Sequence, residues 1–428
     1  MADTTERTAS PSALAGRPPH DDLLAGRGMV LLAVAGLLAA ILLAGLLLRA
    51  LTEPGDTNSY APLADAFLHG RLDITGCVDV DCAIHDGRTW VIFPPLPAVL
   101  AMPFVAMFGP GFAGFIALAL VATAVSLWMW WRIFGRLSLD RPAAIWLLLA
   151  LAFGTPLYYV TIRGDGVWFF AQSTAFLLVT FAIHQTLRGS TLWLAGLAIG
   201  LAFLSRQMSL FYLPFLFVLA LRTDEPLISL RWPHWRRALA LGLPVAAALA
   251  VYFLYNYARF GDPLDTGYGY MMPPGPDDRT MVDDRLDRYG LFSSAYLLFN
   301  VMYLFVQGFH LEFAGPTMTV PQMLDSAGTS LLAASPFVLL AVFAPLRRPV
   351  AIGVLTILII AVPILFYHSN GFTQYNAQRY VLDWLPVLLV ILAFALRRAH
   401  LLPALQVLVT YAIGLNVVTM VMLALTAT

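Results

Sequence analysis

The chain has 428 residues, of which 60% are hydrophobic and only 12% are charged. A soluble protein carries about 25% charged residues, so this composition excludes an ordinary soluble domain. The formal net charge is zero, which gives no indication of a nucleic-acid partner. All 25 basic residues are arginines, so any anion bound by a side-chain cation is bound by a permanently charged guanidinium.

The polar N-terminal segment, 1–28, contains prolines and arginines and is predicted to be disordered in the cytoplasm. It is not a signal peptide, because the apolar run after it is too long and no small-residue cleavage site follows. Apolar runs of about 15 to 25 residues recur along 29–428, close to the length that crosses a ~30 Å hydrocarbon core. We therefore expect a single all-α integral membrane domain. Its predicted spans are 29–51, 112–134, 143–161, 167–187, 191–205, 208–222, 238–258, 327–345, 350–367, 380–396 and 402–425.

Two further apolar stretches, 94–108 and 291–309, are ambiguous, and the placement of arginines decides between the topologies. Four arginines crowd the loop 222–237, which we place in the cytoplasm. The other basic clusters fall on the same side only if neither ambiguous stretch crosses, so we interpret both as interfacial helices. The prediction is about eleven crossings, with the N-terminus in the cytoplasm and the C-terminus outside. One alternative stays open, since a single broken helix over 191–222 would reverse every loop before it.

Two long outer loops result, about 52–111 and 259–327, and long ordered loops usually carry function. Apolar residues recur at helical spacing after Ser59, which predicts a short juxtamembrane helix over 59–69. Asp56 lies just before this helix at the membrane surface, where a carboxylate is costly and suggests a catalytic role. The alternative is that Asp56 or Asn58 merely caps the helix.

The only two cysteines, Cys77 and Cys82, lie in a polar segment of the same loop. On the outer side of the membrane, this pattern favours a local disulfide. A metal site that combines them with Asp79, Asp81 and His85 is the alternative, although no second Cys/His pair completes four ligands at a recognisable spacing.

Other polar side chains lie at the predicted outer ends of the spans. Asp165 either belongs to a site at the level of Asp56 or pairs with Arg163. Arg206 follows an apolar run and either binds a phosphate or extends to the lipid headgroups. Arg379 and Tyr380 enter the predicted span 380–396 from outside.

The second outer loop begins at Arg259 and carries acidic residues that alternate with arginines, a pattern typical of a solvated loop. The acidic residues of this run are Asp277, Asp278, Asp283, Asp284 and Asp287. His310 and Glu312 follow the predicted interfacial helix 291–309, from which they could reach a site.

In order and spacing, these features resemble the GT-C superfamily of membrane glycosyltransferases, in particular the branch of the protein O-mannosyltransferases and the aminoarabinose transferases. The resemblance covers most of 29–396. The residues that carry it in the first loop are Asp56, Tyr60, Gly70, Pro94-Pro95-Leu96 and Phe108-Gly109. The later ones are Asp165, Arg206, Asn256, Arg259-Phe260-Gly261, Gly267-Tyr268, Ala334-Ser335-Pro336-Phe337, Arg379-Tyr380 and Leu385-Pro386.

The resemblance implies a bacterial inner-membrane enzyme with its active site on the outer face. Such an enzyme moves a sugar, with inversion, from a polyprenyl-phosphate donor to a glycan, lipid or protein acceptor. Asp56 would be the general base. The expected substrate-binding residues are Tyr60, Asp165, Arg206, Arg259, His310, Glu312, Arg379 and Tyr380.

Two departures from the family pattern matter. Members often have Asp-Glu where this chain has Asp56-Thr57, which leaves a divalent metal without support, and no cofactor is predicted. Some members have Glu-Lys before the Pro-Pro pair, where this chain has Ile92-Phe93, so one cation for the donor phosphate is missing.

Two rival functions stay open. A transporter or lipid-linked-sugar flippase usually buries charges at mid-bilayer and is often built from repeated halves, whereas the charges here cluster at one face and no internal repeat is evident. A non-catalytic protein of the same fold is the other alternative.

Overall fold

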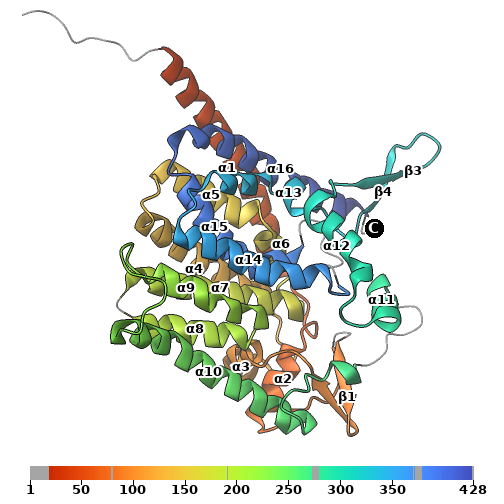
Figure 1. Cartoon of the computed structure of the whole chain (residues 1–428). Helices are drawn as coiled ribbons and strands as arrows, with labels where there is room; N and C mark the ends of the chain where they lie inside the picture. Colours follow the sequence, from red (N-terminus) through yellow and green to blue (C-terminus); the bar gives the residue numbers. More distant parts are fainter. Residues whose placement is uncertain are drawn as a thin grey trace, which may run out of the picture.

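The computed structural model describes residues 19–78, 81–189, 191–271, 279–369, 371 and 378–426. These residues form a bundle of helices with two small antiparallel hairpins (Figure 1). The α-helices are α1 (Pro19–Leu51), α2 (Tyr60–Leu68), α3 (Leu96–Phe108), α4 (Phe115–Arg136), α5 (Arg141–Phe153), α6 (Pro156–Ile162), α7 (Val167–Arg188), α8 (Leu192–Phe203), α9 (Leu213–Leu219), α10 (Trp232–Phe260), α11 (Met281–Tyr289), α12 (Leu297–Val301), α13 (Leu331–Ala334), α14 (Arg348–Leu365), α15 (Leu385–Ala395) and α16 (Leu402–Thr426).

Tighter and wider helical turns extend or join several of these helices. The 3-10 helices are η1 (Gln207–Tyr212), η2 (Tyr268–Tyr270), η3 (Ser294–Tyr296), η5 (Pro336–Phe343), η6 (Arg379–Asp383) and η7 (Ala399–Leu401), and the π-helix is η4 (Met302–Val306). The strands are β1 (Cys82–His85), β2 (Arg88–Val91), β3 (Leu311–Ala314) and β4 (Val320–Leu324). In the β1–β2 hairpin, Cys82 lies opposite Val91 and His85 opposite Arg88.

Six helices in the described ranges are long and apolar enough to cross a membrane, and the bent pair α5–α6 adds a seventh if it is one span. The chain is therefore a multi-pass membrane protein. The other predicted spans coincide with shorter helices: α8 for 191–205, η1 and α9 for 208–222, α13 and η5 for 327–345, and η6 and α15 for 380–396. The count of eleven crossings, and the side on which each terminus lies, stay predictions.

Prolines explain why several predicted spans are not single long helices. Each broken segment has a proline at the start of its second piece, where the ring fits the first turn but cannot continue a preceding helix. These prolines are Pro156, Pro214, Pro336 and Pro386. At the first of them, α5 and α6 meet at 46°.

The N-terminal helix differs from the prediction in length. α1 begins at Pro19, so helix replaces the disorder predicted for 19–28, whereas 1–18 lie outside the described residues. At 1.5 Å per residue its 33 residues extend about 50 Å, which exceeds the thickness of a hydrocarbon core.

Small residues allow the central helices to approach closely. α7 lies between α4 and α8, and α10 packs along α8. A Cβ on Gly196 of α8 would stand 2.5 Å from the Leu241 carbonyl oxygen of α10, so the contact requires glycine. In the core, Trp130 of α4 donates a hydrogen bond of 3.1 Å to Thr180 of α7.

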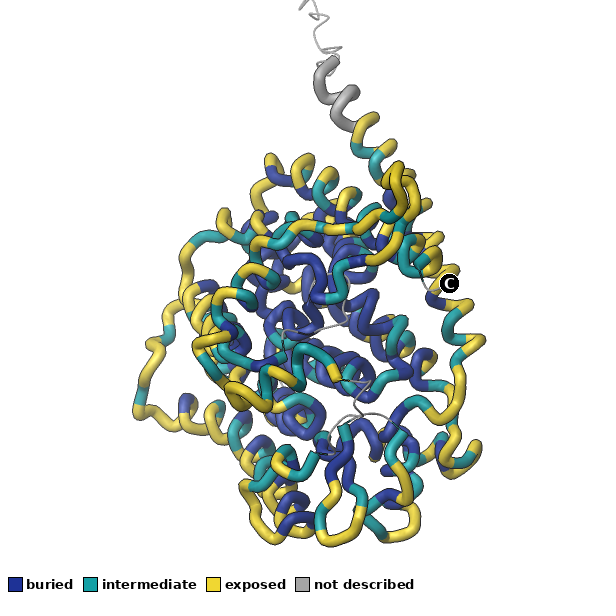
Figure 2. Tube along the Cα trace, turned by 90° about the vertical axis from the view of Figure 1, so that its right-hand side faces the viewer, coloured by how far each residue is buried: buried dark blue, intermediate teal, exposed yellow. Residues whose placement is uncertain are grey.

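The loops that bear the predicted chemistry gather on one side of the bundle. Figure 1 shows β1, α11, β3 and β4 at the right, opposite the connection between α9 and α10 at the left. Figure 2, which looks at this right-hand side, shows buried residues in the centre and exposed residues around them. The Cys77–Cys82 disulfide closes the start of the β1–β2 hairpin, with the two Cα atoms 6.0 Å apart.

The predicted interfacial helix 291–309 is not one α-helix but the series η3, α12 and η4. Asn300 explains its position. The buried Asn300 amide donates to the carbonyls of Ile364, Leu365 and Tyr367 at the end of α14, at 3.3, 3.1 and 2.8 Å. Carbonyls at a helix C-terminus have few partners within the helix, so the Asn300 amide fixes this segment against the end of α14.

Candidate functional site

The turn after α1 is held in place by Glu53. Its two carboxylate oxygens accept hydrogen bonds of 2.9 and 2.8 Å from the backbone N–H groups of Phe115 and Ile116, the first residues of α4. A carboxylate is favourable at a helix N-terminus, where N–H groups lack intrahelical partners. Next to it, a Cβ on Gly55 would stand 2.6 Å from the Gly111 carbonyl oxygen, so only glycine fits.

Asp56 follows in a left-handed backbone conformation, with φ of 58°. Aspartate and asparagine are enriched among non-glycine residues in this region. The Asp56 side chain is exposed, and among the residues that the structure describes it makes no hydrogen bond or ion pair. Asn58, not Asp56, caps α2: its amide oxygen accepts a bond of 3.0 Å from the N–H of Tyr60. The Asp56 carboxylate thus remains accessible beside the start of α2.

Asp165 is buried in an ion cluster behind this turn. Its carboxylate lies 2.6 Å from a guanidinium nitrogen of Arg49 and 3.7 Å from one of Arg163. Asn58 donates a hydrogen bond of 3.4 Å to the carbonyl of Gly164, which joins the Asp56 turn to the same loop. Asp165 therefore pairs with Arg163 and lies in a loop that is bonded to the Asp56 turn, whereas its role in substrate binding stays a prediction.

Phe169 of α7 joins this cluster to the predicted cation Arg379. The guanidinium carbons of Arg163 and Arg379 each lie 5.4 Å from the centre of the Phe169 ring. Arg379 is buried and also stacks over Trp168, and its backbone carbonyl accepts a bond from Gln172 of α7. Guanidinium groups over aromatic faces are stabilised by the ring quadrupole, so Arg379 is fixed with its charge intact.

Arg206 lies on the far side of Tyr380. It forms a two-point pair with Asp383, at 3.2 and 2.5 Å, and its guanidinium carbon lies 5.4 Å from the Tyr380 ring centre. Asp383 is almost fully buried and Arg206 is one-fifth exposed. Tyr212 donates a 2.9 Å bond to the Asp383 carbonyl. The break between α8 and η1 is thereby joined to η6.

Tyr268 and Asp81 extend this cluster toward the β1–β2 hairpin. Asp81 accepts a bond of 2.6 Å from the Trp168 indole N–H. The surrounding protein raises the pKa of the Tyr268 hydroxyl, and the nearby Asp81 and Tyr380 raise it further, against the opposing effect of Arg206. Tyr268 is consequently neutral at physiological pH and can act as a hydrogen-bond donor.

The Arg259 guanidinium makes its contacts within the protein, and a role in substrate binding stays a prediction. The side chain is buried, its guanidinium donates to the Val91 carbonyl and to Asn256, both at 2.7 Å, and it lies 3.9 Å from the Tyr255 ring centre. These contacts attach β2 to the end of α10.

His310 and Glu312 lie apart from the other candidates. Both are exposed on or beside β3, in the hairpin that projects from the upper right of Figure 1, whereas β1 and α2 lie at the lower end. Contacts thus join Asp165 to the turn that bears Asp56 and Tyr60, and join Arg206 and Arg379 to Tyr380.

The alternative metal site is not available as the sequence suggested it, since the disulfide takes up both cysteine sulfurs and Asp79 lies outside the described residues. Within the described part of the chain, no group of three or more His, Cys, Asp or Glu side chains could hold a metal ion.

Several site residues were missed from the sequence. The sequence places Arg49 at the end of a span and Glu53 beside it, offers Asp81 only as a ligand of the alternative metal site, and indicates no role for Trp168 or Asp383. For Asp383 the position inside an apolar run was a usable signal, because a carboxylate there requires a partner. Nothing in the sequence indicates that this partner is Arg206, 177 residues away.

Comparison with known proteins gives one structural likeness. No protein-family model matches the chain, and no curated protein matches it. A similar solved structure is the crystal structure of ArnT from Cupriavidus metallidurans bound to undecaprenyl phosphate, with 15% sequence identity and a TM-score of 0.45. The match covers 85% of this chain and 60% of that one, so this chain spans about three fifths of its length. A likeness of this extent carries no conclusion about activity.

We expect Glu53→Ala to lower thermal stability, because the start of α4 loses both acceptors, at a cost of about 0.5–2 kcal/mol. Glu53→Gln should cost less stability than Glu53→Ala, because the amide oxygen still accepts one hydrogen bond.

Burial outweighs the two hydrogen bonds and raises the pKa of Glu53 above the ordinary 4.5, so its environment disfavours the charge. The stability of the natural chain relative to Glu53→Gln should therefore fall as pH rises through that raised pKa. Melting of the purified variants in detergent at several pH values checks both expectations, and equal losses for Ala and Gln would contradict the first.

Proposed function

We propose that this chain is a membrane glycosyltransferase that moves a sugar from a polyprenyl-phosphate donor to an acceptor at the outer membrane face. The observation that carries the proposal is the Asp56 carboxylate. It is exposed and without a partner among the described residues, whereas the carboxylates of Asp165 and Asp383 are held by arginines. The order of motifs in the sequence, which resembles the GT-C superfamily, adds support.

The reaction is a single inverting displacement. An acceptor hydroxyl attacks the anomeric carbon, its proton passes to the Asp56 carboxylate, and the bond from that carbon to the phosphate oxygen breaks. The bonding electron pair leaves with the polyprenyl phosphate, so negative charge grows on the departing oxygen. Cations fixed in advance stabilise such charge best.

Arg379 and Tyr380 are the groups proposed to receive that charge, because Arg379 is positioned by three aromatic rings. Arg206 serves mainly to fix Asp383 and η6, and its remaining N–H groups are available to the phosphate. Arg259 fixes the β1–β2 hairpin beside the site.

Incubation of the purified protein with radiolabelled polyprenyl-phosphate sugars and a membrane-lipid extract tests the proposal. We expect release of polyprenyl phosphate together with transfer of label to a new product. Uptake of the intact donor into vesicles, with no release, would instead identify a flippase. Neither release nor uptake with any of a panel of hexose and pentose donors would overturn the proposal.

A further inference from the structure

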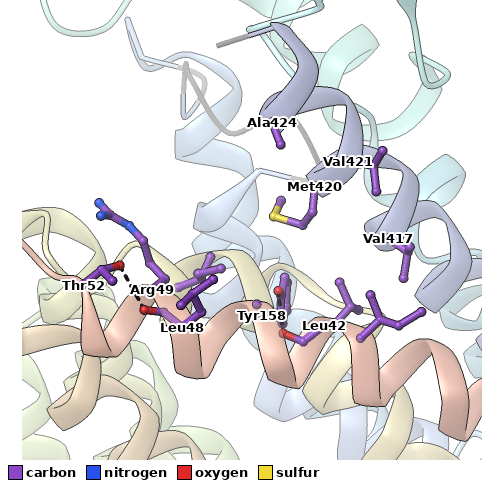
Figure 3. Close-up of a pocket in the computed structure, with 12 residues that line it drawn as sticks. Leu42, Leu48, Arg49, Thr52, Tyr158, Val417, Met420, Val421 and Ala424 are labelled. Atoms are coloured by element: carbon purple, nitrogen blue, oxygen red, sulfur yellow. Dashed lines mark hydrogen bonds between the residues drawn. The ribbon is translucent and has the colours of Figure 1, made fainter. Parts of the chain in front are cut away.

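Arginines near the candidate site are fixed in two different ways. Figure 3 shows Arg49 at one end of an apolar groove lined by α1, α6 and α16, and this cation is already paired with Asp165 at 2.6 Å. Arg206 is paired with Asp383 in the same manner. Arg379 is instead held among aromatic rings, so its position depends on how those rings are themselves fixed.

A hydrogen bond from a distant loop fixes one of these rings, that of Trp168. The Arg379 guanidinium carbon lies 5.4 Å from the ring centres of Trp168 and Phe169 and 5.0 Å from that of Tyr380. Phe169 has no polar group, and Tyr380 follows Arg379 directly in the chain and cannot fix it from outside. The Trp168 indole N–H, by contrast, donates a bond of 2.6 Å to the Asp81 carboxylate. Asp81 therefore orients a ring against which Arg379 packs.

The carboxylate also strengthens the attraction between this ring and the cation. An aromatic ring has a negative face and a positive edge, and the indole N–H lies on that edge. A carboxylate that accepts from the N–H polarises the ring, because groups in one hydrogen-bonded chain polarise one another, and the ring face then attracts a guanidinium more strongly. Asp81 thus acts on Arg379 through the ring of Trp168.

The Cys77–Cys82 disulfide fixes the position of Asp81. Cys82 follows Asp81 directly, begins β1 opposite Val91 and is fully buried. Because the disulfide joins Cys82 to Cys77, Asp81 lies in a short closed loop with both ends held. A cross-link limits the conformations open to the residues that it encloses. The carboxylate therefore stays within reach of Trp168.

We propose that Asp81 is a positioning residue that acts through Trp168 on Arg379, and that the Cys77–Cys82 disulfide holds Asp81 in place. The effect on sugar transfer rests on the proposed function, in which Arg379 receives the charge of the leaving phosphate. The effect on the position of η6, which bears Arg379, does not rest on it, because it requires no reaction.

A double-mutant cycle on the transfer of labelled sugar tests the route through Trp168. Asp81→Leu removes the acceptor, and Trp168→Phe removes the N–H while keeping a ring. Each should lower kcat about tenfold, within the range of coupling in one hydrogen-bond network, and the two together should cost no more than one alone. The KM for the donor should change less than about twofold, because Arg379 acts on charge that develops only as the phosphate leaves. Asp81→Asn keeps an acceptor and should retain more of the rate than Asp81→Leu.

Asp73→Leu is the matched control for this cycle. It makes the same chemical change in the same outer loop, at a carboxylate that lies 3.7 Å from the Arg71 guanidinium, and it should leave kcat unchanged. Losses that multiply in the double variant, or an equal loss in Asp73→Leu, would overturn the route through Trp168.

The role of the disulfide is tested on the natural protein, because the chain contains only these two cysteines. A phosphine reductant breaks the S–S bond and takes up oxygen from water as two thiols form. Reduction should lower kcat about as much as Asp81→Leu does and should have no further effect on the Asp81→Leu variant. The rate of a Cys77→Ser, Cys82→Ser variant should not respond to the reductant. Reduced natural protein with full kcat would overturn the role of the disulfide.

Deuterium exchange at the backbone N–H groups of η6, followed by mass spectrometry of the protein in detergent, gives a readout that needs no turnover. Exchange should be faster in Asp81→Leu and after reduction, and unchanged in Asp73→Leu. Unchanged exchange in Asp81→Leu would overturn the positioning role. Absence of all transfer in the natural protein, with exchange altered as expected, would overturn the proposed function but leave the link from Asp81 to η6 standing.

Discussion

Replacing Asp56 with asparagine is expected to reduce sugar transfer by about 10²–10⁴-fold, the usual contribution of a general base. Asparagine has nearly the same shape and is equally suited to a positive φ, so the turn at φ 58° should persist. Only the ability to accept a proton is lost. Because Asn58 caps α2 and Glu53 anchors the turn, the change should leave thermal stability within about 0.5 kcal/mol of the natural protein. Transfer of a labelled sugar and melting in detergent are the two measurements.

The chain offers a closely matched control for this experiment. Asp86, in the turn between β1 and β2, also has a positive φ, 51°, and its side chain is 86% exposed. Asp86→Asn makes the same chemical change in a similar conformation on the same side of the bundle. It should leave transfer unchanged. A full rate in Asp56→Asn, or an equal loss in both variants, would show that Asp56 is not the base.

Hydropathy was sufficient to predict where the helical segments lie, but not whether each is one long helix. The breaks at Pro156 and Pro336 show why. A proline interior to an apolar run is tolerated when neighbouring groups satisfy the freed backbone, and those groups come from distant sequence. At the first break, the Gly154 carbonyl accepts a bond of 2.6 Å from the hydroxyl of Ser335, which is 181 residues away in the sequence.

For a similar reason, the sequence predicted some residues of the candidate site but not the contacts that define their roles. Asp56 could be selected because its position after the first span is local information. The choice between Asp56 and Asn58 as cap needed the backbone geometry of the turn. The roles of Arg206, which pairs with Asp383, and of Arg259, which donates to the Val91 carbonyl, depend on partners that are distant in the sequence and that only folding brings near.

Arg206→Leu is expected to be the most destabilising single change at the site, because it leaves the Asp383 carboxylate buried and unpaired. Removal of one partner of a buried ion pair costs about 3–5 kcal/mol. The double variant Arg206→Leu, Asp383→Leu should regain most of that stability, because no uncompensated charge remains. Arg279→Ala is the control. Its pairs with Asp284 and Asp287 are largely exposed and screened by solvent, so this change should leave the melting temperature close to that of the natural protein.

The same double variant separates the structural role of Arg206 from a role in catalysis. If Arg206 only fixes η6, the stable double variant should position Arg379 and Tyr380 correctly and transfer sugar at nearly the natural rate. If the free N–H groups of Arg206 also bind the donor phosphate, transfer should stay at least tenfold reduced although the fold has recovered. Melting and labelled-sugar transfer are measured on the single and double variants together. The melting temperature shows whether Asp383 is left buried without a partner, and the transfer rate shows whether the Arg206 guanidinium is needed for the reaction.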